Sequence, residues 1–394
     1  MFESLKAPAP DKIIQLIGMY AEDPRTEKVD LGVGVYKDPD GKTPVMRAVK
    51  AAERLLVETQ DSKSYLSVLG DKSFVSGMAD LVLGDAVAAE RLVGAQAPGG
   101  TGAIRQLCEL IQRAAPETTV WHSDPTWPNH PQILAHLGLK AKTFRYYDAA
   151  AGVVNFDAMC EDLSAAASGD VVILHGCCHN PTGANLTLEQ WEILTTKCAA
   201  QGLVPLVDLA YQGFGDGLEE DVAGLRQMAT ELPELMIAAS CSKNFGLYRD
   251  RVGAALIIGK DVSDAKLAEA NIGTLNRLNF SFPPDHGAKV VSIILHDPDL
   301  KSDWMAELED MRLNMLSLRQ GLSDALRRES NSDRFDYIAA HRGMFTQLGG
   351  TAEKVKALRE DHGVYAVGTG RINIAGLPAG GLDQLAKAIV SVGI

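Results

Sequence analysis

Short apolar runs alternate with longer amphipathic stretches through the middle of the chain. The runs are rich in Val, Ile and Leu at successive positions, a pattern typical of strands that are buried on both faces. They occupy residues 118–123, 141–146, 170–176, 203–208, 234–240 and 253–259. Because helical segments separate them, the pattern predicts an α/β fold in which a mostly parallel sheet lies between helices.

The helical segments carry end signals of their own. Residues 187–202 open on Thr187 with Gln190 three positions later, a capping-box pattern, and they close on Gly202. Residues 303–330 show a long helical period, and strand-like residues 334–340, a helix, a strand at 371–376 and a last helix follow. This change in the pattern of apolar residues predicts a smaller α+β domain at the C-terminal end.

Composition narrows the class of protein. A length of 394 residues favours two domains over one, and 46% hydrophobic residues are enough for a sizeable core. The net charge of −13 argues against a nucleic-acid partner. No apolar run approaches a membrane span or a leader peptide, and six cysteines, two of them adjacent, suit reduced thiols. We therefore expect a cytoplasmic protein that acts on small molecules.

A glycine-rich segment, "GGTGA" at residues 99–103, precedes a predicted helix. Its unencumbered N–H groups suit a phosphate, and a plain turn is the simpler alternative. A dinucleotide fingerprint is the third possibility, but Arg105 stands where that pattern needs its last glycine. We also find no strand pattern directly before the loop.

The segment "HGCCHNPTG" at residues 175–183 follows one of the predicted strands. On an extended strand His175, Cys177 and His179 would share one face, which raises a metal site, yet structural zinc needs four ligands. Asn180 precedes a proline and is therefore held extended, so that its amide can point into a cleft.

Two further strands end in polar residues. Asp208 closes an apolar strand and needs either a structural cap or a cationic ligand, and Tyr211 follows it. Ser240-x-x-Lys243 matches the opening of the serine β-lactamase signature, but the companion motifs are missing. A solvated lysine fits poorly beside a buried strand and Arg251. In an open α/β sheet such strand ends form the ligand site.

Together these segments resemble the class I pyridoxal-phosphate aminotransferases, in the aspartate and aromatic amino-acid branch. The motifs are "HGCCHNPTG", "DLAYQGFGDG" at 208–217 and "SCSKNFGLYRDRVG" at 240–253, and the likeness extends from residue 31 to residue 376. The resemblance implies fold type I, with a seven-stranded, mostly parallel sheet between helices. It also implies a homodimer with shared active sites.

By the same resemblance the chain divides into four parts. Residues 1–13 would form an N-terminal arm, 14–44 part of the small domain, 45–300 the large cofactor-binding domain and 301–394 the rest of the small domain. The small domain is expected to move over the bound substrate.

The resemblance assigns pyridoxal 5′-phosphate as the cofactor. Lys243 would form a Schiff base with it and then act as the base that moves the substrate proton. Asp208 would pair with the pyridine nitrogen, and Asn180 and Tyr211 would hydrogen-bond the ring oxygen. The remaining cofactor contacts would be Gly100, Thr101, Trp127, Ser240, Arg251 and, from the neighbouring subunit, Tyr65.

For the substrate, Arg371 would hold the α-carboxylate and Gly34 would close over it, with Trp127 and Asn180 beside them. Arg277 would meet the side-chain carboxylate of aspartate or glutamate across the dimer interface. Phe282 adds an apolar wall near Arg277 that suits aromatic side chains.

We therefore expect ping-pong transamination of aromatic (Tyr, Phe, Trp) and dicarboxylic (Asp, Glu) amino acids with 2-oxoglutarate, through pyridoxamine phosphate. An aspartate aminotransferase with little aromatic activity is the alternative. An NAD-linked oxidoreductase that uses "GGTGA" would leave Lys243, Asp208 and Arg371 unexplained. A non-catalytic regulator would need a basic DNA-binding segment, which the sequence lacks before residue 45.

Overall fold

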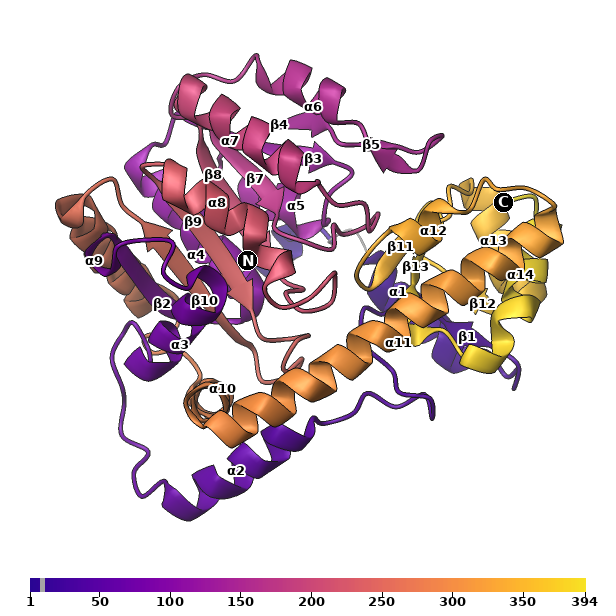
Figure 1. Ribbon diagram of the computed structural model, residues 1–394, viewed down its shortest axis with the longest axis horizontal. Helices are drawn as coiled ribbons and strands as arrows, with labels where there is room; N and C mark the ends of the chain where they lie inside the picture. The colour runs from indigo at the N-terminus through magenta and orange to yellow at the C-terminus, as the bar shows by residue number, and fades with distance from the viewer. Residues whose placement is uncertain (8–10) are drawn as a thin grey trace.

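The computed structural model describes residues 1–7 and 11–394. Figure 1 shows a larger lobe built on a central sheet and a smaller lobe of orange and yellow elements together with the indigo elements α1 and β1. The long diagonal helix α11 (Pro298–Ser330) joins the two lobes. Part of the expected N-terminal arm, residues 8–10, lies outside the described residues. Every described helix is too short or too polar to span a bilayer.

The large lobe contains a seven-stranded sheet in the order β2-β10-β9-β8-β7-β3-β4. Only β10 runs antiparallel to its neighbours, so the sheet is mostly parallel, as expected. The strands are β2 (Leu92–Pro98), β3 (Thr119–Asp124), β4 (Lys140–Arg145), β7 (Val171–His175), β8 (Val204–Leu209), β9 (Leu235–Ser240) and β10 (Val252–Ile258). All six strands expected from the apolar runs are confirmed.

Strand β2 was missed by the sequence analysis, which found no strand before "GGTGA". Its sequence, "LVGAQAP", is dominated by small residues that have little strand preference of their own. Pairing with β10 along its whole length determines its conformation, and Ala95 and Ala97 are fully buried. The glycine loop therefore does follow a strand.

Helices cover both faces of the sheet because alternate strand residues enter two separate core clusters. Helices α4, α5 and α9 bury their apolar residues in one cluster, and α3, α6, α7, α8 and α10 bury theirs in the other. The bounds are α2 (Arg47–Thr59), α3 (Lys72–Leu83), α4 (Gly99–Ala114), α5 (Asn129–His136), α6 (Phe156–Leu163), α7 (Leu188–Gln201), α8 (Ala223–Glu231), α9 (Val262–Asn279) and α10 (Asp285–His296). A short hairpin, β5 (Tyr147–Asp148) with β6 (Val153–Val154), projects beside α6.

The predicted ends of α7 are confirmed. Thr187 Oγ1 accepts a hydrogen bond from the Gln190 backbone N–H, and Gln190 Oε1 accepts one from the Thr187 N–H. Gly202 ends the helix in the left-handed conformation, with φ of 68°.

The small lobe has its own core cluster, formed by Leu31 and apolar residues between Leu318 and Ile394. It contains two small sheets, β1 (Val29–Asp30) with β12 (Val364–Tyr365) and β11 (Phe345–Gln347) with β13 (Arg371–Asn373). The helices of this lobe are α1 (Lys12–Glu22), α12 (Tyr337–Ala340), α13 (Ala352–His362) and α14 (Leu382–Ser391). Helix α11 (Pro298–Ser330) contributes Trp304 and Leu308 to the large-lobe core and Leu318 and Leu322 to the small-lobe core.

The prediction of a strand at residues 334–340 is wrong. Residues 335–341 instead form consecutive turns, and Tyr337–Ala340 is the short helix α12. Short apolar runs do not distinguish strand from helix by periodicity alone. The Ile338 carbonyl accepts a hydrogen bond from buried Arg319, a contact that only the tertiary fold provides.

Candidate active site

A cavity of about 230 Å³ lies where β7, β8 and β9 end. It is lined by residues that are far apart in the chain: Gly34, Gly100, Thr101, Trp127, His175, Asn180, Asp208, Ala210, Tyr211, Ser240, Ser242, Lys243, Tyr248 and Arg251. All of the predicted site residues except Tyr65, Arg277 and Arg371 are among them. The carboxyl ends of parallel strands meet at one edge of a sheet, which explains the convergence.

One end of the cavity is built to receive an anion. Helix α4 begins at Gly99, so its first N–H groups are free, and Arg251 lies beside them. Gly99 has φ of 75°, and a Cβ there would lie 2.5 Å from Arg251 Nη2. Arg251 Nη1 donates to Ser242 Oγ at 3.3 Å and to the Tyr248 carbonyl at 2.9 Å. This geometry supports the phosphate interpretation, while Arg105 still argues against a dinucleotide site.

The cavity is also lined by a buried carboxylate, Asp208. Its Oδ2 accepts a hydrogen bond of 3.1 Å from His130 Nε2, whose Nδ1 lies 2.8 Å from Thr126 Oγ1. Burial by itself would raise the pKa of Asp208, but the His130 hydrogen bond and nearby positive groups outweigh it and hold the pKa below its usual range. Asp208 is therefore a fixed negative charge facing the cavity.

Lys243 lines the same cavity, where the charges of both Asp208 and Arg251 act on it. Its Nζ is 4.6 Å from the centre of the Tyr211 ring. Burial lowers the pKa of the Lys243 amine to about 8; the charge of Asp208 opposes the shift and that of Arg251 adds to it. A lysine with a depressed pKa carries a larger neutral fraction near neutral pH, which suits a nucleophile.

Arg371 supplies a buried guanidinium at the small-lobe side. It lies 4.3 Å from the centre of the Phe345 ring, and its Nη2 donates to the Gly32 carbonyl at 2.7 Å. Its Nη1 is 3.5 Å from Asn180 Oδ1, and Asn180 lines the cavity. Within residues 1–7 and 11–394, Arg371 has no carboxylate partner and its Nε has no hydrogen bond. A buried guanidinium with an unbonded N–H and no paired charge is suited to a carboxylate ligand.

The comparisons with known proteins agree with this geometry. Residues 26–389 match the family model described as "Aminotransferase class I and II". The chain is 52% identical to an aromatic-amino-acid aminotransferase of Paracoccus denitrificans, over the full length of both proteins. The chain belongs to the class I and II aminotransferases. It is also 42% identical to an aspartate aminotransferase of Escherichia coli over the full length of both.

A solved structure extends the likeness to three dimensions. An aromatic-amino-acid aminotransferase from Burkholderia pseudomallei, described as covalently bound to pyridoxal phosphate, superposes with a TM-score of 0.97 at 39% identity. The match covers 100% of this chain and 99% of that one. The aminotransferase fold expected from the motifs is thus confirmed.

Two predicted site residues of the aminotransferase lie away from the cavity in a single copy. Tyr65 is 83% exposed, and its ring stacks on Phe282 at 4.6 Å. The Arg277 guanidinium lies 5.4 Å from the centre of the same Phe282 ring. The three side chains form a surface cluster that is separate from Lys243.

Sequence reasoning missed residues that the aminotransferase site depends on. His130, which is fully buried against Asp208, was not singled out. Tyr248 lines the cavity, and its hydroxyl accepts a hydrogen bond from the Tyr36 N–H at 3.0 Å. The segment "TWPNH" could have pointed to His130, since it follows a strand end, but nothing local connects it with a carboxylate 78 residues later.

The alternative metal set does not assemble. His175 Nε2 lies 3.2 Å from Thr126 Oγ1, and both nitrogens of His179 lie against hydroxyl groups, so neither ring converges with Cys177.

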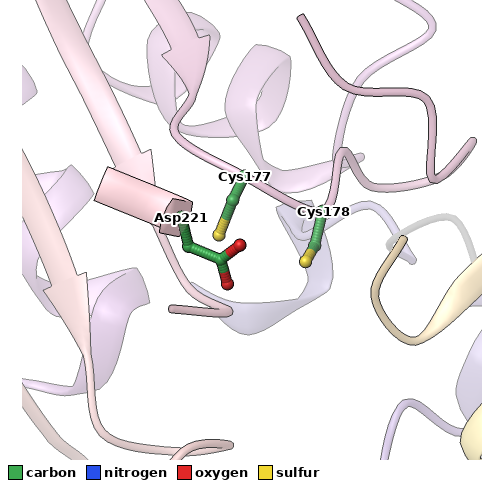
Figure 2. Close-up of side chains that lie close together, drawn as sticks. All are labelled: Cys177, Cys178 and Asp221. Carbon is green, nitrogen blue, oxygen red and sulfur yellow. The ribbon is translucent and has the colours of Figure 1, made fainter. Parts of the chain in front are cut away.

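Figure 2 shows that Cys177 and Cys178 instead lie near Asp221. The Asp221 carboxylate already accepts three backbone N–H bonds from residues 213–216. The contact with Cys178, together with burial, raises the pKa of the Cys177 thiol. Protonated thiols beside an occupied carboxylate form a packed turn, and they do not favour a metal ion.

Proposed function

We propose that this aminotransferase transfers the amino group of aromatic (Tyr, Phe, Trp) and dicarboxylic (Asp, Glu) L-amino acids to 2-oxoglutarate, with pyridoxal 5′-phosphate as cofactor. The observation that carries the proposal is a shared cavity: it is lined by Lys243, a lysine with a lowered pKa, by the buried carboxylate of Asp208 and by the anion-binding start of α4. The 52% identity with an aromatic-amino-acid aminotransferase supports the aromatic part of the range.

The residues present fit this cofactor at both ends. The start of α4, with Ser240 and Arg251, would hold its phosphate, and Asp208 would hold its ring nitrogen protonated. Asn180 and Tyr211 would donate hydrogen bonds to the ring oxygen, with Trp127 along the ring. When bound, the cofactor supplies an aldehyde carbon that reacts with amines and a ring that accepts electron density from the substrate.

The chain's own residues then orient the substrate and move its proton. Arg371 would pair with the α-carboxylate, which fixes the Cα–H bond with respect to Lys243. The neutral amine of Lys243 would remove the Cα proton and return it as the general acid. Gly34 leaves room for the Phe345 ring, because a Cβ on Gly34 would lie 2.6 Å from Phe345 Cζ.

The alternative is an aspartate aminotransferase with little aromatic activity. It is less favoured, because the identity with a relative named an aspartate aminotransferase is 42%, against 52% with one named an aromatic-amino-acid aminotransferase. Phe282 favours the dual range. Its ring, stacked on that of Tyr65, lies beside Arg277, so that one surface presents both an apolar wall and a cation.

We also propose a homodimer in which Tyr65 and Arg277 complete the site of the partner copy. The 83% exposure of Tyr65, and its distance from its own cavity, support this assignment. Residues 14–44 and 301–394 would form the small domain that closes over the substrate, because Arg371 and Gly34 both lie in them. All six cysteines are free, which supports a cytoplasmic location.

A donor panel tests the proposal directly. Purified protein with bound cofactor is offered Asp, Glu, Tyr, Phe and Trp with 2-oxoglutarate, and product formation is measured. We expect turnover with both classes, parallel-line ping-pong kinetics, and complete loss of turnover in Lys243→Ala. Turnover that survives in Lys243→Ala would disprove the role of the lysine, and activity with acidic donors only would favour the alternative.

A further inference from the structure

Arg319, on the small-lobe half of α11, is a fully buried cation that the proposed mechanism does not use. Its Nη2 lies 2.6 Å from the Phe345 carbonyl oxygen, 2.8 Å from that of Gly343 and 3.0 Å from that of Arg342. Its Nη1 donates to the Ile338 carbonyl at 3.0 Å. Among residues 1–7 and 11–394, no carboxylate lies within ion-pair distance of it.

Burying a guanidinium in this way is costly, since no opposite charge compensates for lost hydration. The cost shows in the pKa of Arg319, which burial lowers to about 9. An apolar side chain would fill the same core position, so the distinctive contribution of Arg319 is its planar fork of donors. That fork gathers carbonyl groups of residues 338–345, and it determines the path of this segment.

The segment leads directly to the carboxylate receptor. Phe345 begins β11, which pairs with β13, the strand that contains Arg371. The Phe345 ring lies 4.3 Å from the Arg371 guanidinium carbon, and it also packs against Gly34. A shift of the Phe345 backbone would therefore move the surface on which the Arg371 guanidinium rests.

The large lobe meets the segment from the other side at Gly183, the last residue of "NPTG". The Arg342 N–H donates to the Gly183 carbonyl at 2.9 Å. Gly183 has φ of 81°, and a Cβ there would collide with the Phe345 carbonyl oxygen and lie 3.1 Å from Arg319 Nη2. The motif glycine is thus needed for close approach. Asn180, three residues earlier, contacts Arg371 Nη1.

We propose that Arg319 is a positioning residue for substrate binding: it holds the carbonyls of Arg342, Gly343 and Phe345 against Gly183, and so keeps Phe345 under Arg371. The inference rests on the proposed function, which assigns the α-carboxylate to Arg371. Arg319 touches neither substrate nor cofactor in this proposal, and it affects the affinity of the Arg371 site for carboxylates.

The test is a double-mutant cycle on the cofactor-loaded enzyme with 3-phenylpropanoate, a carboxylate without an amine, as the probe. Binding is followed through the visible absorption of the cofactor. Arg319→Lys keeps the charge and loses the fork, and we expect its Kd to rise roughly tenfold, with the cofactor content unchanged. Arg371→Lys should raise Kd further, and the double variant should bind within about twofold of Arg371→Lys.

Arg328→Lys is the matched control, because Arg328 lies on the same helix and is exposed in a surface pair with Asp383. It should leave Kd unchanged. A purely structural role for Arg319 predicts that the effects of Arg319→Lys and Arg371→Lys multiply, and that result would overturn the inference. An Arg319→Lys enzyme with the wild-type Kd would overturn it as well.

Gly183→Ala provides a second route if Arg319→Lys does not fold. The added methyl displaces the same segment from the large-lobe side, so it should also raise Kd and show the same non-additivity with Arg371→Lys. A wild-type Kd in Gly183→Ala would count against the inference. If Arg371→Lys itself binds the probe as tightly as wild type, the proposed function fails instead, so the two failures are distinguishable.

Discussion

Replacement of Arg277 by leucine separates the two substrate classes most sharply. Arg277 is exposed and makes no ion pair among the described residues, and its guanidinium contacts the ring of Phe282. Leucine keeps the apolar contact with Phe282 and removes the charge. Because the substitution removes no ion pair from the described part of the folded chain, we expect the free energy of unfolding to change by no more than about 0.5 kcal/mol.

The expected effect on aspartate follows from the pair that is lost. Hydrogen bonds to charged groups contribute roughly 1.5–3 kcal/mol each, and a two-pronged arginine–carboxylate pair contains two of them. If the loss is about 3–4 kcal/mol in total, kcat/KM for aspartate falls roughly 10²- to 10³-fold. Phenylalanine has no second carboxylate, so its kcat/KM should stay within about threefold, or ~0.6 kcal/mol.

The assay measures kcat/KM for aspartate and for phenylalanine in the absence of 2-oxoglutarate. The single-turnover change in cofactor absorbance then reports the donor half-reaction alone. Arg277→Lys is the matched control: it keeps a charge, loses the fork and should retain part of the aspartate activity. Equal losses for both donors in Arg277→Leu would refute the reasoning, since the acidic and aromatic side chains would then not share this pocket.

Three further predictions follow from the same geometry. In cofactor-free protein, reductive methylation of Lys243, measured by peptide mass spectrometry, should rise with pH to a plateau with a midpoint near 8, because only the neutral amine reacts. A midpoint near the ordinary lysine value of 10.5 would contradict the argument that burial lowers the pKa of Lys243. Asp208→Asn should lower kcat at least a hundredfold, or ~2.7 kcal/mol, since an amide does not hold the ring nitrogen protonated; unchanged kcat would remove Asp208 from the mechanism. Thr187→Ala should lower the free energy of unfolding by ~1 kcal/mol, because the α7 cap is lost, and it should leave turnover intact. A loss of turnover would show that the cap has a wider role.

Much of the candidate site could be inferred from the sequence because its residues follow strands with a strong local pattern. Asp208, Ser240 and Lys243 each stand at or beyond the end of an apolar run, and parallel strands bring such ends together whatever the details of packing. The pairing of His130 with Asp208 could not be inferred in this way. It depends on how α5 is placed against the sheet, and no local pattern encodes that contact.

The sequence by itself determined the α/β class, the six strongly apolar strands, the ends of α7 and the identity of the residues around Lys243. Periodicity and capping record which face of an element is buried, and both are properties of neighbouring residues. Only the tertiary structure determined the conformation of two segments. Residues of β2 form a strand because β10 pairs with them, and α12 is a short helix whose Ile338 carbonyl accepts a hydrogen bond from Arg319. In each of these cases the deciding contact joins segments that are distant in the chain, so its energy is absent from any local window.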